Sequence, residues 1–330
     1  MSKDKPKIIV IMGPTASGKS DVAIKLAKKF GGEIISADSR QIYKGLNIGT
    51  GKVRKDFTGF FNFKFSIFQP REGFFSKGIR HHLIDVAKPQ EDFNVSHFKK
   101  MAKEKIEEIL SRKKIPIICG GTAFWIDALT KDLNLPEVPP DEILRGQLAL
   151  ETTEELFAKL EKLDPERAKN IDSQNKVRLI RAIEICQAIG KVPAQFTVTS
   201  SQFTVKYNFL EIGIRVSREI LNEKIQIRLD ERFKEGMTAE VEKLHKQGVS
   251  WEWLERIGLE YRWISRFLQG KIELGEMSAQ GGCASGAREK LYFAIIHYAK
   301  RQMTWLQRNP NIIWCSDYKS IRKEVQKFLE

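Results

Sequence analysis

The sequence contains few cysteines and no apolar run long enough to cross a membrane. Its 330 residues include four widely separated cysteines, which are Cys119, Cys186, Cys283 and Cys315. No C-x-x-C pair and no histidine pair at metal-ligand spacing accompanies them, so we interpret them as reduced thiols and exclude a disulfide framework. Residues 1–7 are polar, and the apolar run that follows is too short for a signal peptide. These absences predict a cytoplasmic protein without membrane contact.

Acidic residues are also in deficit. Lys and Arg number 56 against 42 Asp and Glu, which gives a formal net charge of +14. A surplus of this size creates a field rather than a set of local pairs, and it favours a polyanionic partner such as nucleic acid. A generally basic proteome is the alternative explanation. Hydrophobic residues make up 42% of the chain and exclude a disordered protein.

The most informative pattern is a glycine-rich stretch at residues 13–20. It matches G-x-x-x-x-G-K-[ST] and follows the apolar run Ile8–Met12, while helical spacing continues to Phe30. A strand, a loop and a helix in this order form a phosphate-binding loop, because successive backbone N–H groups converge on an anion. Lys19 would add a charge, and Ser20 would bind Mg²⁺. The predicted diphosphate-binding residues are Gly13, Thr15, Ala16, Ser17, Gly18, Lys19 and Ser20.

Short apolar runs alternate with helical patterns along the chain. The strands are predicted at 8–12, 33–37, 82–86, 115–119, 209–214 and 312–315, and helices at 22–30, 95–111 and 219–248. This alternation predicts an α/β fold, a P-loop NTPase-like parallel sheet flanked by helices, with an inserted helical subdomain. Three prolines in 135–141 precede helical spacing up to Gly190. We therefore expect a first part of the core at 1–134, a helical insertion at 135–204, and core completion with C-terminal helices at 205–330.

A phenylalanine-rich segment interrupts the first part of the core. Residues 61–65 alternate with period two, and further phenylalanines flank them at positions 57, 60, 68, 74 and 75. The pattern predicts a hairpin with one buried face. Stacking platforms for unpaired bases are the functional alternative.

Two aspartates follow predicted strands. Asp38 ends the second strand beside the phosphate loop, at the sheet edge where such folds place their chemistry. Asp85 closes the H-H-L-I-D motif near the end of the third and is a candidate partner of magnesium, either directly or through one of the magnesium ligands. The phosphate loop alone would predict a kinase or NTPase, but no N-K-x-D guanine signature is present, because residues 175–178 lack the aspartate.

Several motifs, taken in order, resemble one family. The chain shows G-P-T-A-S-G-K-S, then D-S-x-Q-x-Y from Asp38, H-H-L-I-D from His81, G-G-T ending at Thr122, and Y-A-K-R-Q from Tyr298 followed by Thr304 and Trp305. Together they are similar to tRNA dimethylallyltransferases over about residues 7–314. The resemblance implies transfer of a dimethylallyl group from dimethylallyl diphosphate to the exocyclic amine of the adenine next to the anticodon, with release of pyrophosphate.

The resemblance also implies roles for particular residues. Asp38 would be the general base, since an aryl amine is a poor nucleophile until its proton leaves; a helix cap or a magnesium ligand is its alternative role. Thr122 would position the amine and the leaving group, and Arg232 would stabilise the diphosphate, although a charged helix face would explain Arg232 equally well. Mg²⁺ would be the cofactor.

The expected partner is tRNA, bound through its anticodon stem-loop by a monomeric enzyme. Arg178 and Arg181 share one helix face in the insertion, and Lys300 and Arg301 lie on the last long helix, so these side chains would contact phosphates. Near Asp38, an unstacked adenine would meet further polar groups. The predicted tRNA-binding residues are Asp38, Ser39, Gln41, Arg178, Arg181, Lys300 and Arg301.

Three features depart from the family pattern. Gly258-Leu259-Glu260-Tyr261 replaces the usual Gly-Tyr-Lys-Glu, Ile295-Ile296 replaces Thr-Arg, and the phenylalanine-rich segment is longer than usual. We expect all three to lie away from Asp38 and the phosphate loop. The competing hypotheses are an adenylate isopentenyltransferase acting on free nucleotides, a P-loop small-molecule kinase and a nucleotide-gated RNA-binding module.

Overall fold

The computed structural model describes residues 5–56, 60–62, 67–69, 73–193, 206–275 and 286–330. The chain forms two compact units, one made of Met1–Ile126 with Lys206–Glu330, and the other of Asp127–Val205. The predicted insertion at 135–204 therefore falls within the second unit. Each unit has its own buried core and is described by itself.

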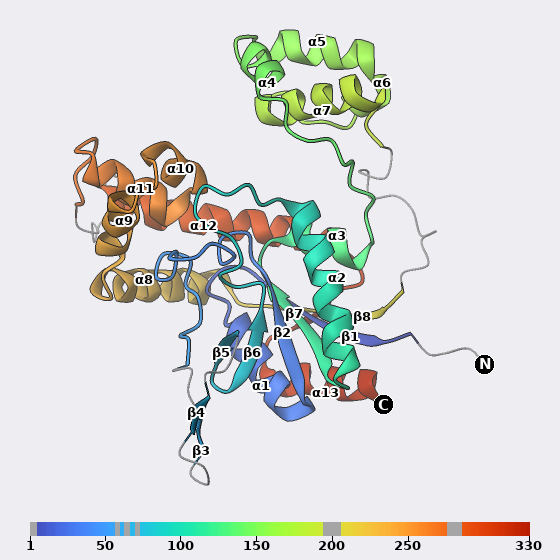
Figure 1. Ribbon diagram of the computed structural model, residues 1–330, viewed down its shortest axis with the longest axis vertical. Helices are drawn as coiled ribbons and strands as arrows, with labels where there is room; N and C mark the ends of the chain where they lie inside the picture. The colour runs from blue at the N-terminus through green and yellow to red at the C-terminus, as the bar shows by residue number, and fades with distance from the viewer. Residues whose placement is uncertain (1–4, 57–59, 63–66, 70–72, 194–205, 276–285) are drawn as a thin grey trace. The chain divides into compact units, whose positions relative to one another are not determined.

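A seven-stranded sheet forms the centre of the first unit (Figure 1). Its order is β5 (Phe74–Ser76), β6 (Ile79–His82), β2 (Gly32–Ala37), β7 (Ile115–Gly120), β1 (Lys7–Met12), β8 (Asn208–Ile214) and β9 (Ile313–Cys315). All neighbouring pairs are parallel except β5–β6, so the predicted parallel sheet is confirmed. The carboxyl ends of β1, β2 and β7 consequently meet at one edge.

Helices cover the central strands, which explains their continuous apolar sequences. Helices α1 (Lys19–Phe30) and α13 (Tyr318–Leu329) share a core with Ile9, Ile11 and Ile117. The intervening residues Ile8 and Val10 are also fully buried, because successive side chains point to opposite faces and both faces are covered. Helix α2 (Val95–Ser111) packs on β2 and β7, and α3 (Ala123–Thr130) follows β7.

The helix predicted at 219–248 is two helices, so that prediction was wrong in its length. Helix α8 (Arg218–Lys234) ends before Gly236, whose φ of 95° lies in the left-handed region, and α9 (Met237–Lys246) begins after it. Helices α10 (Trp251–Ile257) and α11 (Leu259–Leu268) follow. Figure 1 shows these four helices gathered around one half of the long α12 (Ala287–Leu306).

The second unit is a small helical bundle. It contains α4 (Glu142–Leu148), α5 (Thr153–Leu163), α6 (Pro165–Ala168) and α7 (Lys176–Ile189), which bury a core that includes Leu156, Leu160 and Leu179. Each helix begins after a residue whose side chain accepts a backbone N–H bond from the first turn. Local capping therefore sets the boundaries of these helices.

The segment before α2 departs from the predicted pattern. Strands β3 (Phe60–Asn62) and β4 (Ile67–Gln69) pair antiparallel, as the predicted hairpin requires, whereas the side chains at 57–72 lie outside the described residues. The strand predicted at 82–86 is wrong in position, because β6 ends at His82. Leu83 and Asp85 have φ values of 59° and 57°, which no strand accommodates.

Candidate active site

The phosphate loop has the geometry of an anion cradle. Gly18, with φ 86°, immediately precedes α1, and Ala16 also has a positive φ of 61°. These values turn the chain sharply, so backbone N–H groups and the positive end of α1 point into one space. The hydroxyl of Ser17 is buried in this loop and has no hydrogen-bond partner within the described part of the chain. An orphaned donor in a loop of this kind fits a phosphate oxygen.

Lys19 lies half-buried in this cradle. Its Nζ donates to the carbonyl of Pro14 at 3.2 Å. Burial lowers the pKa of Lys19; the charges of Cys119 and Asp38 oppose that shift, and those of Arg228 and Arg232 add to it. Three cations and one carboxylate thus converge close to the loop. The positive charges of these side chains would stabilise an anion bound among them.

Asp38 and Thr122 lie at the carboxyl ends of the neighbouring strands β2 and β7. Asp38 Oδ1 accepts bonds from the backbone N–H groups of Arg40 (3.0 Å) and Gln41 (3.4 Å), so it caps its own turn. Thr122 Oγ1 accepts from the N–H of Ser39 at 3.0 Å. Among the described residues, Asp38 Oδ2 accepts no hydrogen bond. One carboxylate oxygen therefore fixes the turn and the other is left for a ligand.

Gln302 on α12 joins the phosphate loop to the Thr122 turn. Its Oε1 accepts from the N–H of Thr15 at 2.8 Å, and its Nε2 donates to the carbonyl of Gly121 at 2.7 Å. A Cβ at Gly121 would lie 2.4 Å from that Nε2, so glycine is required for this approach. The sequence analysis quoted Gln302 within a motif but gave it no role, because its partners are 181 and 287 residues away.

Two arginines of α8 face the loop that follows Asp38. Arg228 Nη2 donates to the carbonyl of Gly51 at 3.2 Å, and Arg232 Nη1 donates to that of Gly49 at 3.0 Å. Burial, reinforced by the neighbouring charge of Arg232, lowers the pKa of Arg228 to about 10. Arg232 is 7% exposed, so its alternative interpretation as part of a solvated helix face is wrong. Arg228 was missed, although its spacing of four residues from Arg232 places both on one face.

Glu260 on α11 pairs with two of these basic residues. Its Oε1 accepts from Arg232, and its Oε2 lies 3.4 Å from Nη1 of Arg40. The guanidinium of Arg40 also lies 5.4 Å from the ring centroid of Tyr298. The expectation that the 258–261 departure lies away from the site is therefore wrong, because Glu260 contacts Arg232 directly.

The loop 46–52 is held from both sides. The carboxylate of Glu240 accepts the backbone N–H groups of Asn47, Ile48 and Gly49 at 2.9, 2.7 and 3.1 Å. Lys52 Nζ lies 2.5 Å from Asp85 Oδ1, in an ion pair whose lysine is buried and whose carboxylate is half-exposed. The carbonyls that receive Arg228 and Arg232 are thus fixed in place.

The other residues predicted to contact RNA have different surroundings. The amide of Gln41 bonds Ser36 and the carbonyls of Thr50 and Gly51 at 3.3–3.5 Å, and Ser39 lies on the Thr122 turn. Lys300 and Arg301 are exposed on α12. Arg301 lies over the ring of Tyr298 at 5.9 Å.

In the second unit the two predicted arginines differ. Arg178 is exposed, and its charge adds to the burial that lowers the pKa of Arg167. Arg181 is half-buried; it binds the buried carboxylate of Glu184 and donates to the carbonyl of Val138 at 2.8 Å. Only Arg178 therefore presents an uncommitted guanidinium.

No group of three or more His, Cys, Asp or Glu side chains suited to a metal occurs within the described ranges. Mg²⁺ is often held by one or two protein oxygens together with substrate phosphates and water. The Ser20 hydroxyl fits this mode, because it is an oxygen donor in the first turn of α1, directly after the loop. The residues present are consistent with a magnesium ion brought by a diphosphate.

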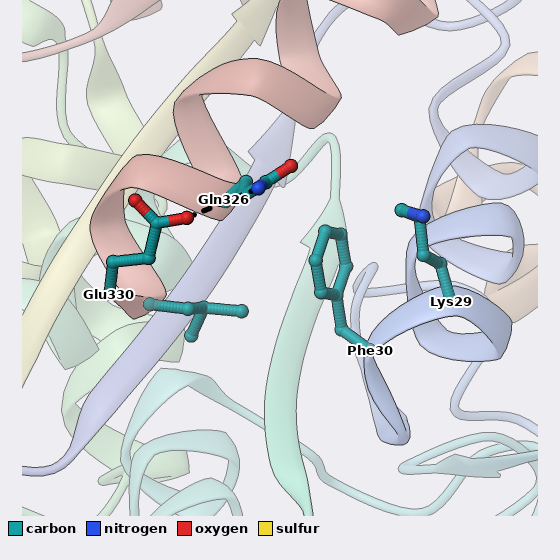
Figure 2. A pocket seen from close by; sticks show the side chains of 5 residues that line it. Lys29, Phe30, Gln326 and Glu330 are labelled. Carbon is teal, nitrogen blue, oxygen red and sulfur yellow. Dashed lines mark hydrogen bonds between the residues drawn. The ribbon is translucent and has the colours of Figure 1, made fainter.

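A separate surface pocket lies between α1 and α13 and is lined by Lys29, Phe30, Gln326, Leu329 and Glu330 (Figure 2). Phe30 ends α1, whereas Lys19 begins it, so about 16 Å of helix separates this pocket from the cradle. The pocket is therefore not part of the candidate active site. None of the described helices is long and apolar enough to cross a membrane.

Comparison with known proteins identifies relatives along the whole chain. The IPP transferase model matches residues 41–309, and the isopentenyl transferase model matches residues 6–59. The tRNA dimethylallyltransferase 2 of Treponema denticola is 40% identical, with 92% of this chain and 93% of that protein covered. The full-length tRNA isopentenylpyrophosphate transferase of Bacillus halodurans is 31% identical, with a TM-score of 0.66 and 98% and 96% of the two chains covered.

A third similarity is to a eukaryotic dimethylallyltransferase crystallised while acting on tRNA. It is 25% identical, with a TM-score of 0.72, and the alignment covers 98% of this chain and 77% of that one. The similarity thus extends across both units of the chain.

Proposed function

Because the chain belongs to the IPP transferase family, we propose that it is a tRNA dimethylallyltransferase whose active site is the cradle around Lys19. One observation supports this assignment most strongly. The phosphate loop, Asp38 and Thr122 follow three strands, β1, β2 and β7, that are adjacent and parallel. An anion site and a carboxylate with a free oxygen therefore lie side by side.

The proposed reaction begins with the exocyclic N6 of the adenine on the 3′ side of the anticodon. N6 attacks C1 of dimethylallyl diphosphate and forms a C–N bond, while the C–O bond breaks and pyrophosphate leaves with the electron pair. Asp38 Oδ2 takes the proton from N6 as the bond forms. Thr122 fixes the turn that carries Ser39 and holds the amine close to C1.

Pyrophosphate accumulates negative charge as it leaves, so cations aimed at it stabilise the transition state more than the ground state. Lys19 and the backbone N–H groups of Ala16 and Gly18 receive the diphosphate, since the N–H of Thr15 is bound to Gln302 and that of Ser17 to Pro14. Arg228 is the better candidate than Arg232 for the facing arginine, since Arg232 is already paired with Glu260. Mg²⁺ bound by Ser20 would neutralise part of the charge on the phosphate oxygens.

The RNA is held by exposed basic side chains. We propose that Lys300 and Arg301 on α12, together with Arg178 in the second unit, contact phosphates of the anticodon stem-loop. Ser39 and Gln41 line the space where an unstacked adenine would enter. The enzyme acts as a monomer in the cytoplasm, where its tRNA substrate is found.

The direct test is transfer of label from dimethylallyl diphosphate to unmodified tRNA in the presence of magnesium. We expect labelled tRNA, and a loss in kcat of about 10²–10⁴-fold for Asp38→Asn with tRNA affinity retained. Labelling of free AMP would support the nucleotide-specific alternative, and ATP-dependent phosphorylation of a metabolite would support a kinase. Full activity of Asp38→Asn would contradict the role of the carboxylate.

A further inference from the structure

The strongest unassigned feature is a buried carboxylate among the site cations. The Glu260 side chain is only 4% exposed, and it pairs with the side chains of Arg232 and Arg40, which are also largely buried. A carboxylate desolvated to this degree is retained only with charged or hydrogen-bonding partners. Glu260 is therefore fixed in its position by the same arginines that it binds.

Both partners of Glu260 lie next to residues of the proposed reaction. Arg40 donates its backbone N–H to Asp38 Oδ1 at 3.0 Å, and its guanidinium is held between Glu260 and the ring of Tyr298. Arg232 lies one turn from Arg228, and the charges of both affect Lys19. One carboxylate thus contacts both the turn of the proposed base and the cation cluster of the proposed diphosphate site.

We propose that Glu260 is a positioning residue of the transfer site, an internal counter-ion that keeps Arg232 from the diphosphate and holds Arg40 so that the Asp38 turn stays in place. The proposal rests on the proposed function. Without this carboxylate, the charges of Lys19, Arg228 and Arg232 would be offset less, with the carboxylate of Asp38 remaining beside them. The cluster would then bind pyrophosphate more tightly and release it more slowly.

Glu260→Gln tests this, because glutamine keeps the shape and an acceptor oxygen but removes the charge. We expect inorganic pyrophosphate, titrated calorimetrically with magnesium, to bind the variant about 3–10-fold more tightly than it binds wild type. A tenfold change corresponds to about 1.4 kcal/mol. In transfer assays the KM for dimethylallyl diphosphate should fall together with kcat. A residue that only supports folding would not produce this joint change.

Two further variants complete the test. Glu260→Asp should restore kcat in part, and Glu260→Gln combined with Arg232→Gln should return pyrophosphate affinity to within twofold of wild type, because the extra cation is gone. Unchanged or weaker pyrophosphate binding by folded Glu260→Gln would overturn the proposal. Wild-type protein that neither binds pyrophosphate nor labels tRNA would instead overturn the proposed function.

Discussion

Arg228 and Arg232 lie one helical turn apart on α8 and donate to two carbonyls of the same loop, but among the described residues only Arg232 also pairs with a carboxylate. The two side chains therefore differ in the charge they can offer to a ligand. Arg228 makes no direct ion pair within the described ranges, although the charges of Glu260 and Asp38 act on it, whereas Arg232 is bound to Glu260 directly. Although Arg228 and Arg232 lie on the same face of α8, we therefore expect their substitutions to have different effects.

We expect Arg228→Ala to lower kcat/KM by about 10²–10³-fold, as removal of a donor to a developing oxyanion does. Its stability should change little, since no described carboxylate is left unpaired. Arg232→Ala should lose less activity but about 3 kcal/mol of stability, because Glu260 remains buried with only Arg40. Steady-state kinetics and urea unfolding of the two variants separate these effects. Equal losses of activity would contradict the assignment.

Gly51 places the loop against both arginines. Its φ is 61°, and a Cβ there would lie 1.8 Å from Arg228 Nη2 and 2.1 Å from Arg232 Nη2. We expect Gly51→Ala to cost about 1–2 kcal/mol through the left-handed backbone. By displacing the guanidinium groups it should also raise the KM for dimethylallyl diphosphate at least about tenfold.

Gly270→Ala is the matched control for this prediction. Gly270 has a φ of 68°, and a Cβ there would meet no atom within 4 Å. Both variants should therefore lose stability through the left-handed backbone, while Gly270→Ala keeps the wild-type KM. If both variants show the wild-type KM, close packing of the arginines on Gly51 has no role in binding the diphosphate.

Local sequence predicts much of this site. The strand, loop and helix around Lys19 are encoded by the continuous stretch 7–30, and Asp38 and Thr122 follow apolar runs whose parallel pairing brings their ends together. Which of the two arginines faces the diphosphate and which pairs with a carboxylate could not be predicted in this way. Arg228 and Arg232 have the same spacing pattern, and the carboxylate that distinguishes them lies 28 residues after Arg232 on another helix.

Backbone conformation explains the other differences. The helical pattern of 219–248 continues through Gly236, so periodicity alone does not reveal the break between α8 and α9. Likewise, the apolar residues after His82 are typical of a strand, yet Leu83 takes a left-handed conformation as the chain turns. Gly236 is a local helix-stop signal that periodicity does not take into account, whereas no glycine marks the turn at Leu83.

The buried imidazole of His81 should make the free energy of unfolding depend on pH. Burial and the neighbouring charge of His82 lower its pKa from 6.5 to about 4, with Asp56 opposing the shift. The unfolded chain therefore binds more protons between these values, and the stabilising contribution is complete above pH 6.5 and is lost as the pH falls toward 4. We expect a loss of about 3 kcal/mol in wild type over this range.

His81→Phe should remove this part of the pH dependence. Urea unfolding between pH 4 and 7 measures it as the difference between wild type and variant, which cancels the titration of the other groups. His297→Gln, a change at an exposed histidine of α12, is the matched control for the loss of a histidine. A wild-type curve parallel to that of His81→Phe would contradict the prediction.

The basic side chains proposed to bind tRNA differ in how far they are committed within the protein. Lys300 and Arg301 are exposed on α12 and Arg178 on α7, whereas Arg181 binds Glu184 and the carbonyl of Val138. Each phosphate contact contributes about 0.7–0.9 to the slope of log K against log salt. We expect Arg178→Ala to reduce the slope by about one such contact, and Lys300→Ala with Arg301→Ala by about two, while pyrophosphate affinity stays unchanged.

Arg181→Ala should instead leave the slope intact and lower the unfolding temperature, because it leaves buried Glu184 with one basic partner fewer. A lower slope for Arg181→Ala at wild-type stability would show that this arginine, too, reaches the RNA.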